Sequence, residues 1–487
     1  MTDLNELKDR KQAVIVIHGI GDQRPMETLR GFLEAVLTKS EKPYLPEYWS
    51  KPDAFSKSFE LRRCSAPRRR DRPRTDFFEF YWQHLMQGNR VSHVRRWVLS
   101  LLFRRPSKVP AHLRPLWWLS WVVVLAAVAL ALGGGVAGYL EAGGLAWLMP
   151  AVGAAGLVLQ GFLLTHIADA ARYLDPSPAN VPARQKIRSA GIDLLKELHD
   201  RGDYNRIIVV GHSLGSVIGY DILYHCWTER HASHGSPEAP KHDALKALEA
   251  LARRQRKDPP AGREEIAAAQ RAYGFELIEN GQPWLVTDFV TLGSPLAHAE
   301  LLLARDAAEF ATRQRQRELP SCLPYLEYGT VFSFKNRYQV EVQADGVAET
   351  PKRTTRERTI RVPHHAAVFA PVRWTNLYFP SRFFIDGDII GGPLADTTAP
   401  ATRRFGPAVR DVRVRTKAAF GLLSHTRYWR LHPADAALPD APVPALRAAL
   451  ALDDKPVWEE RLKAAEEEAP VAEAPVAAAE PPVLRKA

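Results

Sequence analysis

The chain has 487 residues, a formal net charge of +11, 46% hydrophobic residues and 25% charged residues. It is long enough to bury a large core and too apolar for a disordered protein. Its three cysteines, Cys64, Cys226 and Cys322, form no repeated spacing. That pattern excludes a disulfide-stapled scaffold and a cysteine zinc site, and it favours a reducing compartment. Residues 1–11 are polar, and we expect no signal peptide there.

The N-terminal part, about residues 1–90, begins the predicted core. Ala13 to Ile17 is a β-branched apolar run that ends in His18-Gly19-Ile20-Gly21, a pattern typical of a buried parallel strand that leads into a glycine-rich loop. A helix is predicted next, because apolar residues share one helical face: Leu29, Phe32, Leu33, Val36 and Leu37. Phe77 to Trp82 predicts a second strand.

Residues 91–180 contain the strongest apolar segments. Trp117 to Leu140 is a charge-free run of about 24 residues, roughly 36 Å as a helix, against a hydrocarbon core of about 30 Å. A short polar break precedes a second run of about 20 residues, Leu145 to Leu164. The two runs predict a transmembrane helical hairpin that interrupts the soluble fold. The alternative is a pair of buried core helices.

Basic residues flank both runs. They are Arg90, Arg95, Arg96, Arg104, Arg105, Lys108 and Arg114 before the first, and Arg172, Arg184, Lys186 and Arg188 after the second. The positive-inside rule therefore places both flanks and the attached catalytic part on the cytoplasmic side, where they would attract anionic lipids. Another basic cluster, Arg62 to Arg74, shows no recognisable DNA or RNA fold around it. We expect a loop that faces solvent or lipid there, and no nucleic-acid partner.

Residues 181–432 continue the core. Ile187 to His199 predicts an amphipathic helix, and strands are predicted at Ile207 to Val210, Val286 to Leu292, Thr375 to Phe379 and Val412 to Val414. Strands that alternate with helices indicate a mostly parallel α/β sheet.

Three stretches depart from that alternation. Residues 231–283 are charged and helix-prone, and residues 306–371 are basic and partly strand-like. Both are predicted insertions at one end of the sheet, either lids over a site or peripheral elements without a gating role. Residues 433–487 are rich in Ala, Pro and Glu and are expected to be a disordered tail.

The chemistry centres on Gly211-His212-Ser213-Leu214-Gly215, which follows an apolar strand directly and opens a predicted helix from Leu214 to Cys226. Such a tight strand-to-helix turn strains the serine backbone, and small residues on both sides avoid clashes. The Ser213 Oγ is then held out at the top of the sheet, with a helix N-terminus beneath any developing negative charge.

Together with the loop after the first strand, this motif resembles the α/β-hydrolase superfamily, in its lipase and esterase branch. Two later motifs share the resemblance: Trp374-x-Asn376 followed by Asp388-Ile389-Ile390-Gly391-Gly392, and His425-x-x-Tyr428-Trp429. The motifs occur in the superfamily's order of nucleophile, acid and histidine. The resemblance implies an α/β-hydrolase fold with the transmembrane hairpin and lid or cap insertions added to it.

The resemblance also implies roles. Ser213 would be the nucleophile, His425 the general base and Asp388 the acid that orients it. Asp386 remains an alternative acid, and His432, His364 and His365 are alternatives to His425. The oxyanion hole would use the backbone N–H groups of Ile20 and Leu214. His18 and His212 are expected to support their loops.

Nothing in the sequence resembles a P-loop, a dinucleotide fingerprint or an H-E-x-x-H metal motif, so we expect neither a cofactor nor a metal. The expected function is a membrane-anchored serine hydrolase that cleaves lipid esters, with membrane lipids as both anchor and substrate. Two alternatives stay open: a catalytically silent, hydrolase-like membrane interaction module, and a lipase effector delivered into a target membrane. The sequence leaves the oligomeric state open.

Overall fold

The structure is a computed structural model. It describes residues 11–20, 24–37, 46–56, 58–69, 72–86, 103–109, 114, 117–118, 121–122, 125, 173–175, 177–255, 262–282, 284–343, 353–381, 387–395, 404–417 and 421–453.

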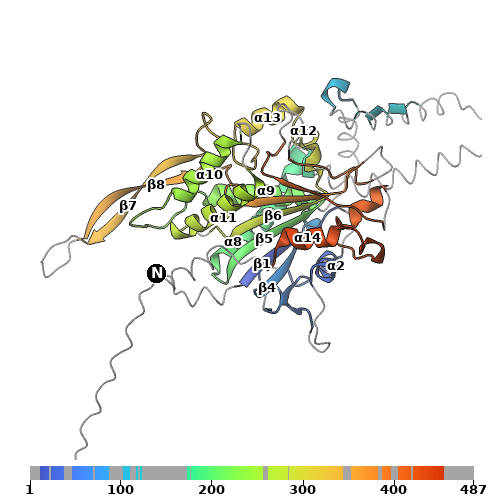
Figure 1. Ribbon diagram of the computed structural model, residues 1–487, viewed down its shortest axis with the longest axis horizontal. Coiled ribbons are helices and arrows are strands. Elements are labelled where there is room, and N and C mark those ends of the chain that lie inside the picture. The colour runs from blue at the N-terminus through green and yellow to red at the C-terminus, as the bar shows by residue number, and fades with distance from the viewer. Residues whose placement is uncertain are drawn as a thin grey trace, which may run out of the picture.

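An eight-stranded, mostly parallel sheet forms the centre of the molecule, in the order β10-β9-β6-β5-β1-β4-β3-β2 (Figure 1). Every pairing from β10 to β4 is parallel, whereas β3 runs antiparallel to both β4 and β2. The predicted parallel α/β sheet is therefore confirmed. The strands are β1 (Lys11–Ile17), β2 (Trp49–Pro52), β3 (Arg62–Ala66), β4 (Thr75–Phe80), β5 (Tyr204–His212), β6 (Val286–Leu292), β9 (Arg373–Tyr378) and β10 (Arg410–Arg413).

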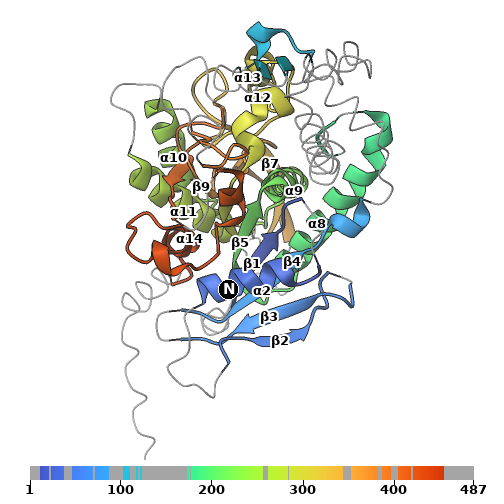
Figure 2. The same ribbon diagram turned by 90° about the vertical axis from the view of Figure 1, so that its right-hand side faces the viewer.

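Both faces of the sheet are covered, which explains the continuous apolar runs of its central strands. Alternate residues of β1 enter opposite cores, with Ile15 in one and Val14 in the other. Two long helices pack on the Ile15 side, α8 (Val181–Asp200) and α9 (Leu214–Arg230). On the Val14 side lie α2 (Glu27–Val36) and α14 (Pro442–Leu450) (Figure 2).

The expectation of a loop over Arg62 to Arg74 is wrong for its first residues, because β3 begins at Arg62. Cys64 and Ala66 are buried against the core of the sheet, while Arg62 is exposed. The buried part of the strand consists of three small side chains, those of Cys64, Ser65 and Ala66, which is why the arginine-rich sequence gives no strand pattern.

The two predicted insertions contain three helices and a β-ribbon, and a fourth, short helix lies just before the second insertion. The helices are α10 (Asp243–Arg254), α11 (Arg263–Glu279), α12 (Ala299–Leu302) and α13 (Ala307–Arg315). The ribbon pairs β7 (Ser333–Gln343) with β8 (Arg353–Pro363) in antiparallel register and extends away from the sheet (Figure 1). Short 3-10 helices complete the described chain: η1 (Gln83–Leu85), η2 (Pro106–Lys108), η5 (Pro178–Asn180), η6 (Pro295–His298), η7 (Gly421–Thr426) and η8 (Pro433–Asp435).

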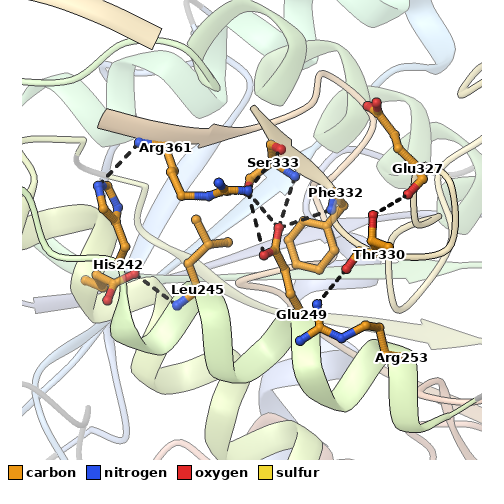
Figure 3. Close-up of polar contacts among 10 residues, drawn as sticks. His242, Leu245, Glu249, Arg253, Glu327, Thr330, Phe332, Ser333 and Arg361 are labelled. Carbon is orange, nitrogen blue, oxygen red and sulfur yellow. Dashed lines mark hydrogen bonds and ion pairs between the residues drawn. The ribbon is translucent and has the colours of Figure 1, made fainter. Parts of the chain in front are cut away.

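A buried carboxylate on α10 fixes the base of this ribbon (Figure 3). Glu249 accepts hydrogen bonds from the backbone N–H groups of Phe332 and Ser333, each at 3.1 Å, and from the Ser333 hydroxyl at 2.6 Å. Arg361 of β8 donates to the same hydroxyl at 2.8 Å. The ribbon is thus attached to α10 through both of its strands.

The predicted disordered tail is wrong for residues 433–453, which are ordered. Leu446 and Leu450 of α14 are fully buried in the Val14 core. The last carbonyl groups of this helix also accept hydrogen bonds from the buried Arg206, at 3.2 Å to Leu450 and 2.7 Å to Ala451. A distant arginine therefore helps to hold a segment whose composition alone suggests disorder. Residues 454–487 lie outside the described ranges.

The predicted transmembrane hairpin falls almost entirely outside the described residues. Of its two runs, 117–140 and 145–164, only five residues at the start of the first are described. In the part of the chain that is described, no helix combines the length and the hydrophobicity needed to cross a bilayer.

Candidate active site

The backbone turns sharply at Ser213, between the end of β5 and the start of α9. Its φ of 51° and ψ of −127° lie in a region that non-glycine residues rarely adopt. The Ser213 N–H donates to the carbonyl of Leu292 at the end of β6, at 2.9 Å. The strained elbow is thus held by the neighbouring strand, with the N-terminus of α9 beneath it.

Three glycines make room for this elbow. A Cβ on Gly211 would lie 2.5 Å from the Ser216 Cα, and one on Gly215 would lie 2.3 Å from the Ile17 carbonyl oxygen. Facing the serine, a Cβ on Gly19 would lie 2.9 Å from the Ser213 Cβ. The glycines of the sequence motif are therefore required by backbone contacts that a side chain would prevent.

Asp388 and His425 form a buried pair beside the elbow. The His425 Nδ1 lies 2.8 Å from the Asp388 Oδ2, and Asp388 is fully buried. The Tyr428 hydroxyl donates to the same Oδ2 at 2.9 Å, and the Ile390 N–H donates to Oδ1 at 2.9 Å. Burial acts to raise the pKa of Asp388, but the charge of His425 and these hydrogen bonds outweigh it, so the pKa lies below its ordinary value.

This pairing defines the state of the imidazole. An ionised Asp388 only accepts hydrogen bonds, so the Nδ1 of His425 carries the hydrogen. The opposite nitrogen, Nε2, is buried and has no hydrogen-bond partner among the described residues. A neutral His425 therefore keeps an available lone pair on Nε2, as a general base requires.

His425 and Asp388 both approach Gly293, the residue after β6, and the Ser213 N–H bonds the residue before it. A Cβ on Gly293 would lie 2.8 Å from the Asp388 Oδ2 and 3.0 Å from the His425 Cε1. The preceding residue, Leu292, accepts the hydrogen bond from Ser213. The structure thus brings Asp388 and His425 into direct contact and places the Ser213 backbone near them, although Ser213 and His425 are more than two hundred positions apart in sequence. Among the described residues, no hydrogen bond joins the Ser213 Oγ to the His425 Nε2.

His212 and His18 support the surrounding loops, as expected. The His212 Nε2 lies 2.9 Å from the carbonyl oxygen of His425, so its N–H fixes the histidine loop to the elbow. The His18 Nδ1 bonds the carbonyl of Gly19 at 2.8 Å. Burial is the main cause that lowers the pKa of His212 to about 3 and that of His18 to about 4. Both rings are therefore neutral near pH 7.

The two predicted oxyanion donors flank the serine. Leu214 follows it directly as the first residue of α9. Ile20 follows Gly19, whose Cα faces the Ser213 Cβ, and its side chain is half-buried against the core. Leu214 therefore begins the helix after the nucleophile, and Ile20 lies in the loop that faces it.

The alternative residues lie elsewhere or outside the described ranges. The alternative acid, Asp386, belongs to residues 382–386, which are not described. The ring of His364 bonds the Tyr325 carbonyl at 3.2 Å, and the ring of His365 packs near His231. His432 accepts a hydrogen bond from Ala434 at the start of η8. None of these three histidines bonds Asp388.

Sequence reasoning assigned no role to two supporting residues. Tyr428 donates a hydrogen bond to the same Asp388 Oδ2 that His425 contacts. It belongs to the motif His425-x-x-Tyr428, but the motif did not indicate this role. Ser216 donates to the Ser213 carbonyl at 2.5 Å and contacts the Ser294 hydroxyl at 2.6 Å. Only the fold brings Ser294 to this position, so no sequence signal would have revealed it.

Among the described residues, no group of three or more His, Cys, Asp or Glu side chains is placed to hold a metal ion. The three cysteines are buried free thiols. No protein-family model matches the chain, and neither a curated protein nor a solved structure is detectably similar to it. The function is therefore argued from the site itself.

Proposed function

We propose that the chain is a membrane-anchored serine hydrolase of the α/β-hydrolase superfamily, from its lipase and esterase branch, that cleaves carboxylic esters of lipids. One observation carries the proposal: a buried Asp388–His425 pair lies beside a serine held in a strained strand-to-helix turn. Strain of this kind at a polar residue is characteristic of functional sites.

In the first half-reaction, the Ser213 Oγ attacks the ester carbonyl carbon and its proton passes to the His425 Nε2. Asp388 stabilises the imidazolium through the Nδ1 hydrogen bond of 2.8 Å. The carbonyl oxygen becomes an oxyanion, which accepts hydrogen bonds from the N–H groups of Leu214 and Ile20. When the tetrahedral intermediate collapses, the alcohol leaves with the proton from His425, and the acyl group remains on Ser213.

In the second half-reaction, His425 removes a proton from water, and the hydroxide attacks the acyl carbon. The bond between the acyl carbon and the Ser213 Oγ breaks, and the Oγ recovers the proton from His425. The products are a carboxylic acid and free enzyme. No redox partner is needed.

The preference for lipid esters rests on the membrane anchor. The charge-free runs 117–140 and 145–164 are long enough to span a bilayer, and basic residues flank both. At the start of the first run, Trp118, Val122 and Leu125 follow helical spacing and are 55%, 60% and 60% exposed. An apolar stripe of this kind suits a lipid environment. Anchored there, with the catalytic part on the cytoplasmic side, the site would meet lipid esters at high local concentration.

Turnover of a water-soluble nitrophenyl ester tests the chemistry. Ser213→Ala should lower it by several orders of magnitude, because only oxyanion stabilisation and binding would survive. The matched control is Ser189→Ala, a change on α8 at a residue that contacts none of the three triad residues in the described structure. A wild-type chain without esterase activity would favour a catalytically silent membrane module instead. Equal turnover by the wild type and Ser213→Ala would remove Ser213 as nucleophile.

A further inference from the structure

A cavity of about 480 Å³ lies between α2 and the loop that carries His425. One wall is a single face of α2, with Glu27, Gly31 and Glu34 at helical spacing. The opposite wall includes Arg427, Trp429 and Arg430. Its volume falls within the range of about 300–1,000 Å³ that is usual for small-molecule sites. We call this cavity the α2 pocket.

The α2 pocket is lined by neighbours of the triad, although neither Ser213 nor His425 lines it. Its lining includes Gly19 and His212. Gly19 faces the Ser213 Cβ, and the His212 ring lies 4.8 Å from the His425 ring, centroid to centroid. Arg427 follows His425 by two residues. A group bound in the pocket would therefore lie on the side of His425, the residue that protonates the leaving alcohol.

The charged side chains of the pocket form no ion pair with one another in the described part of the chain, although the Glu27 Oε2 accepts a hydrogen bond from the Arg24 N–H at 3.4 Å. Among the described residues, no side-chain ion pair involves the two glutamates of the pocket, Glu27 and Glu34, or its two arginines, Arg427 and Arg430. The Nε of Arg427 is buried and bonds no described residue, and a buried donor without a partner is costly. Two glutamates thus line the α2 wall and two arginines line the other; Glu27, Glu34 and Arg430 are exposed, and Arg427 is half-buried.

We propose that the α2 pocket binds the zwitterionic headgroup of a phospholipid, with its phosphate on Arg427 and Arg430 and its ammonium group near Glu27, Glu34 and the Trp429 ring. Guanidinium groups suit phosphate oxygens, and carboxylates with an indole face suit a quaternary or primary ammonium. This assignment rests on the proposed function and specifies its substrate. The bond broken joins the acyl carbon to the glycerol oxygen, and the alcohol that carries the headgroup leaves with the proton from His425.

Three substrates with the same short acyl chains, presented in the same micelles, test this assignment on the full-length chain. They are a phosphatidylcholine, a phosphatidic acid and a diacylglycerol. We expect kcat/KM for the phosphatidylcholine to exceed the value for the diacylglycerol by tenfold or more. The double variant Arg427→Gln, Arg430→Gln should lower that ratio by about tenfold or more, as expected for lost charge-assisted hydrogen bonds. Arg427→Lys should retain part of the preference for phosphatidylcholine over diacylglycerol.

The carboxylates are tested separately. The double variant Glu27→Gln, Glu34→Gln should lower the ratio of phosphatidylcholine to phosphatidic acid hydrolysis. Arg356→Gln and Glu238→Gln are the matched controls, since both residues are exposed and neither lines the pocket. Equal hydrolysis of phosphatidylcholine and diacylglycerol would overturn the proposal. A preference for phosphatidic acid that the glutamate variants leave unchanged would also overturn it, in favour of a simple anion site.

Binding separates this proposal from the proposed function. With the Ser213→Ala chain, glycerophosphocholine should bind more tightly than inorganic phosphate, and the Arg427→Gln, Arg430→Gln changes should weaken its binding. Equal affinity for the two ligands, or an affinity that these changes leave intact, would reject the headgroup site even if the wild type hydrolyses esters. Conversely, a chain that binds glycerophosphocholine but hydrolyses no ester would refute only the hydrolase proposal.

Discussion

Asp388 is a fully buried carboxylate whose hydrogen bonds come from His425, Tyr428 and the backbone of Ile390. A buried charge is tolerated only where such partners replace water. Three donors converge on one side chain here, and one of them is the proposed general base. This convergence distinguishes Asp388 from an ordinary acidic residue in a loop.

Asp388→Asn should therefore lower turnover by about 10⁴-fold, because an amide no longer selects the Nδ1–H tautomer of His425 or stabilises its cation. Asp386→Asn should have a much smaller effect. Steady-state hydrolysis of a soluble ester by both variants measures the difference. The reverse order of activities would transfer the role to Asp386.

Glu79 of β4 gives a pH-dependent prediction. It is buried, its Oε2 accepts a hydrogen bond from the Met26 N–H at 2.6 Å, and its Oε1 has no partner among the described residues. Burial raises the pKa of Glu79 from 4.5 to about 7. The hydrogen bond from Met26 lowers this pKa, but by less than burial raises it. The folded state thus holds the proton more tightly than the unfolded state does.

A group of this kind stabilises the fold below the unfolded pKa, and that stability is lost as pH rises through the folded pKa. Between about pH 4.5 and 7, Glu79 should cost up to about 3 kcal/mol of unfolding free energy. Glu79→Gln removes this titration. Its Tm should fall less than the wild-type Tm between pH 5 and pH 8, and parallel pH profiles of the two proteins would contradict the prediction.

At the scale of elements, sequence patterns predicted the strands and turns whose conformation is determined by their own residues. Central strands such as β1 and β6 are buried on both faces, so they are continuous apolar runs that need no partner to be recognised. The elbow glycines were likewise visible, because their spacing reflects backbone contacts. The triad order followed from the resemblance of four motifs.

Elements held by distant partners were not predictable. The helix α14 depends on Arg206, which lies more than two hundred residues earlier. The strand β3, which lies next to the edge strand β2, begins with two arginines and has only small side chains in its buried part. The partners of Glu249 lie on a β-ribbon more than eighty residues later. In each case, tertiary contacts supply stability that local propensity does not indicate.

The ribbon anchor gives a prediction at this scale (Figure 3). Glu249→Ala leaves two backbone N–H groups and the Ser333 hydroxyl without their acceptor. We expect a loss of about 3–5 kcal/mol of unfolding free energy and faster hydrogen exchange in β7. The control Glu238→Ala removes an exposed carboxylate and should change stability by about 0.5 kcal/mol at most. An equal effect of both variants would show that Glu249 does not anchor the ribbon.

At the scale of the whole molecule, the sheet continues on both sides of the predicted membrane hairpin. Before it, β4 pairs with β1, and after it, β5 pairs with the opposite edge of β1. The part that holds the two apolar runs, which precedes the core helix α8, is therefore an insertion within one fold. A fold tolerates replacement of such an inserted segment when the replacement removes no buried backbone.

Replacing residues 114–169 by a flexible linker should thus leave a folded, soluble protein that still cleaves a small water-soluble ester. Most activity on bilayer lipids should disappear, because the tether no longer concentrates the enzyme at its substrate. Flotation with vesicles and hydrolysis of vesicle lipids measure both effects. A variant that stays membrane-integral would show that these runs are not the anchor. Undiminished hydrolysis of vesicle lipids by a soluble variant would remove the basis for a lipid substrate.

Covalent labelling of the full-length chain by a fluorophosphonate tests the central claim most directly, because the reagent reacts with a serine only where a base activates it. Mass spectrometry of the digested protein should locate the label on Ser213, and both Ser213→Ala and Asp388→Asn should greatly reduce labelling. A chain that remains unlabelled, or one whose label lies on another serine, would contradict the proposed nucleophile.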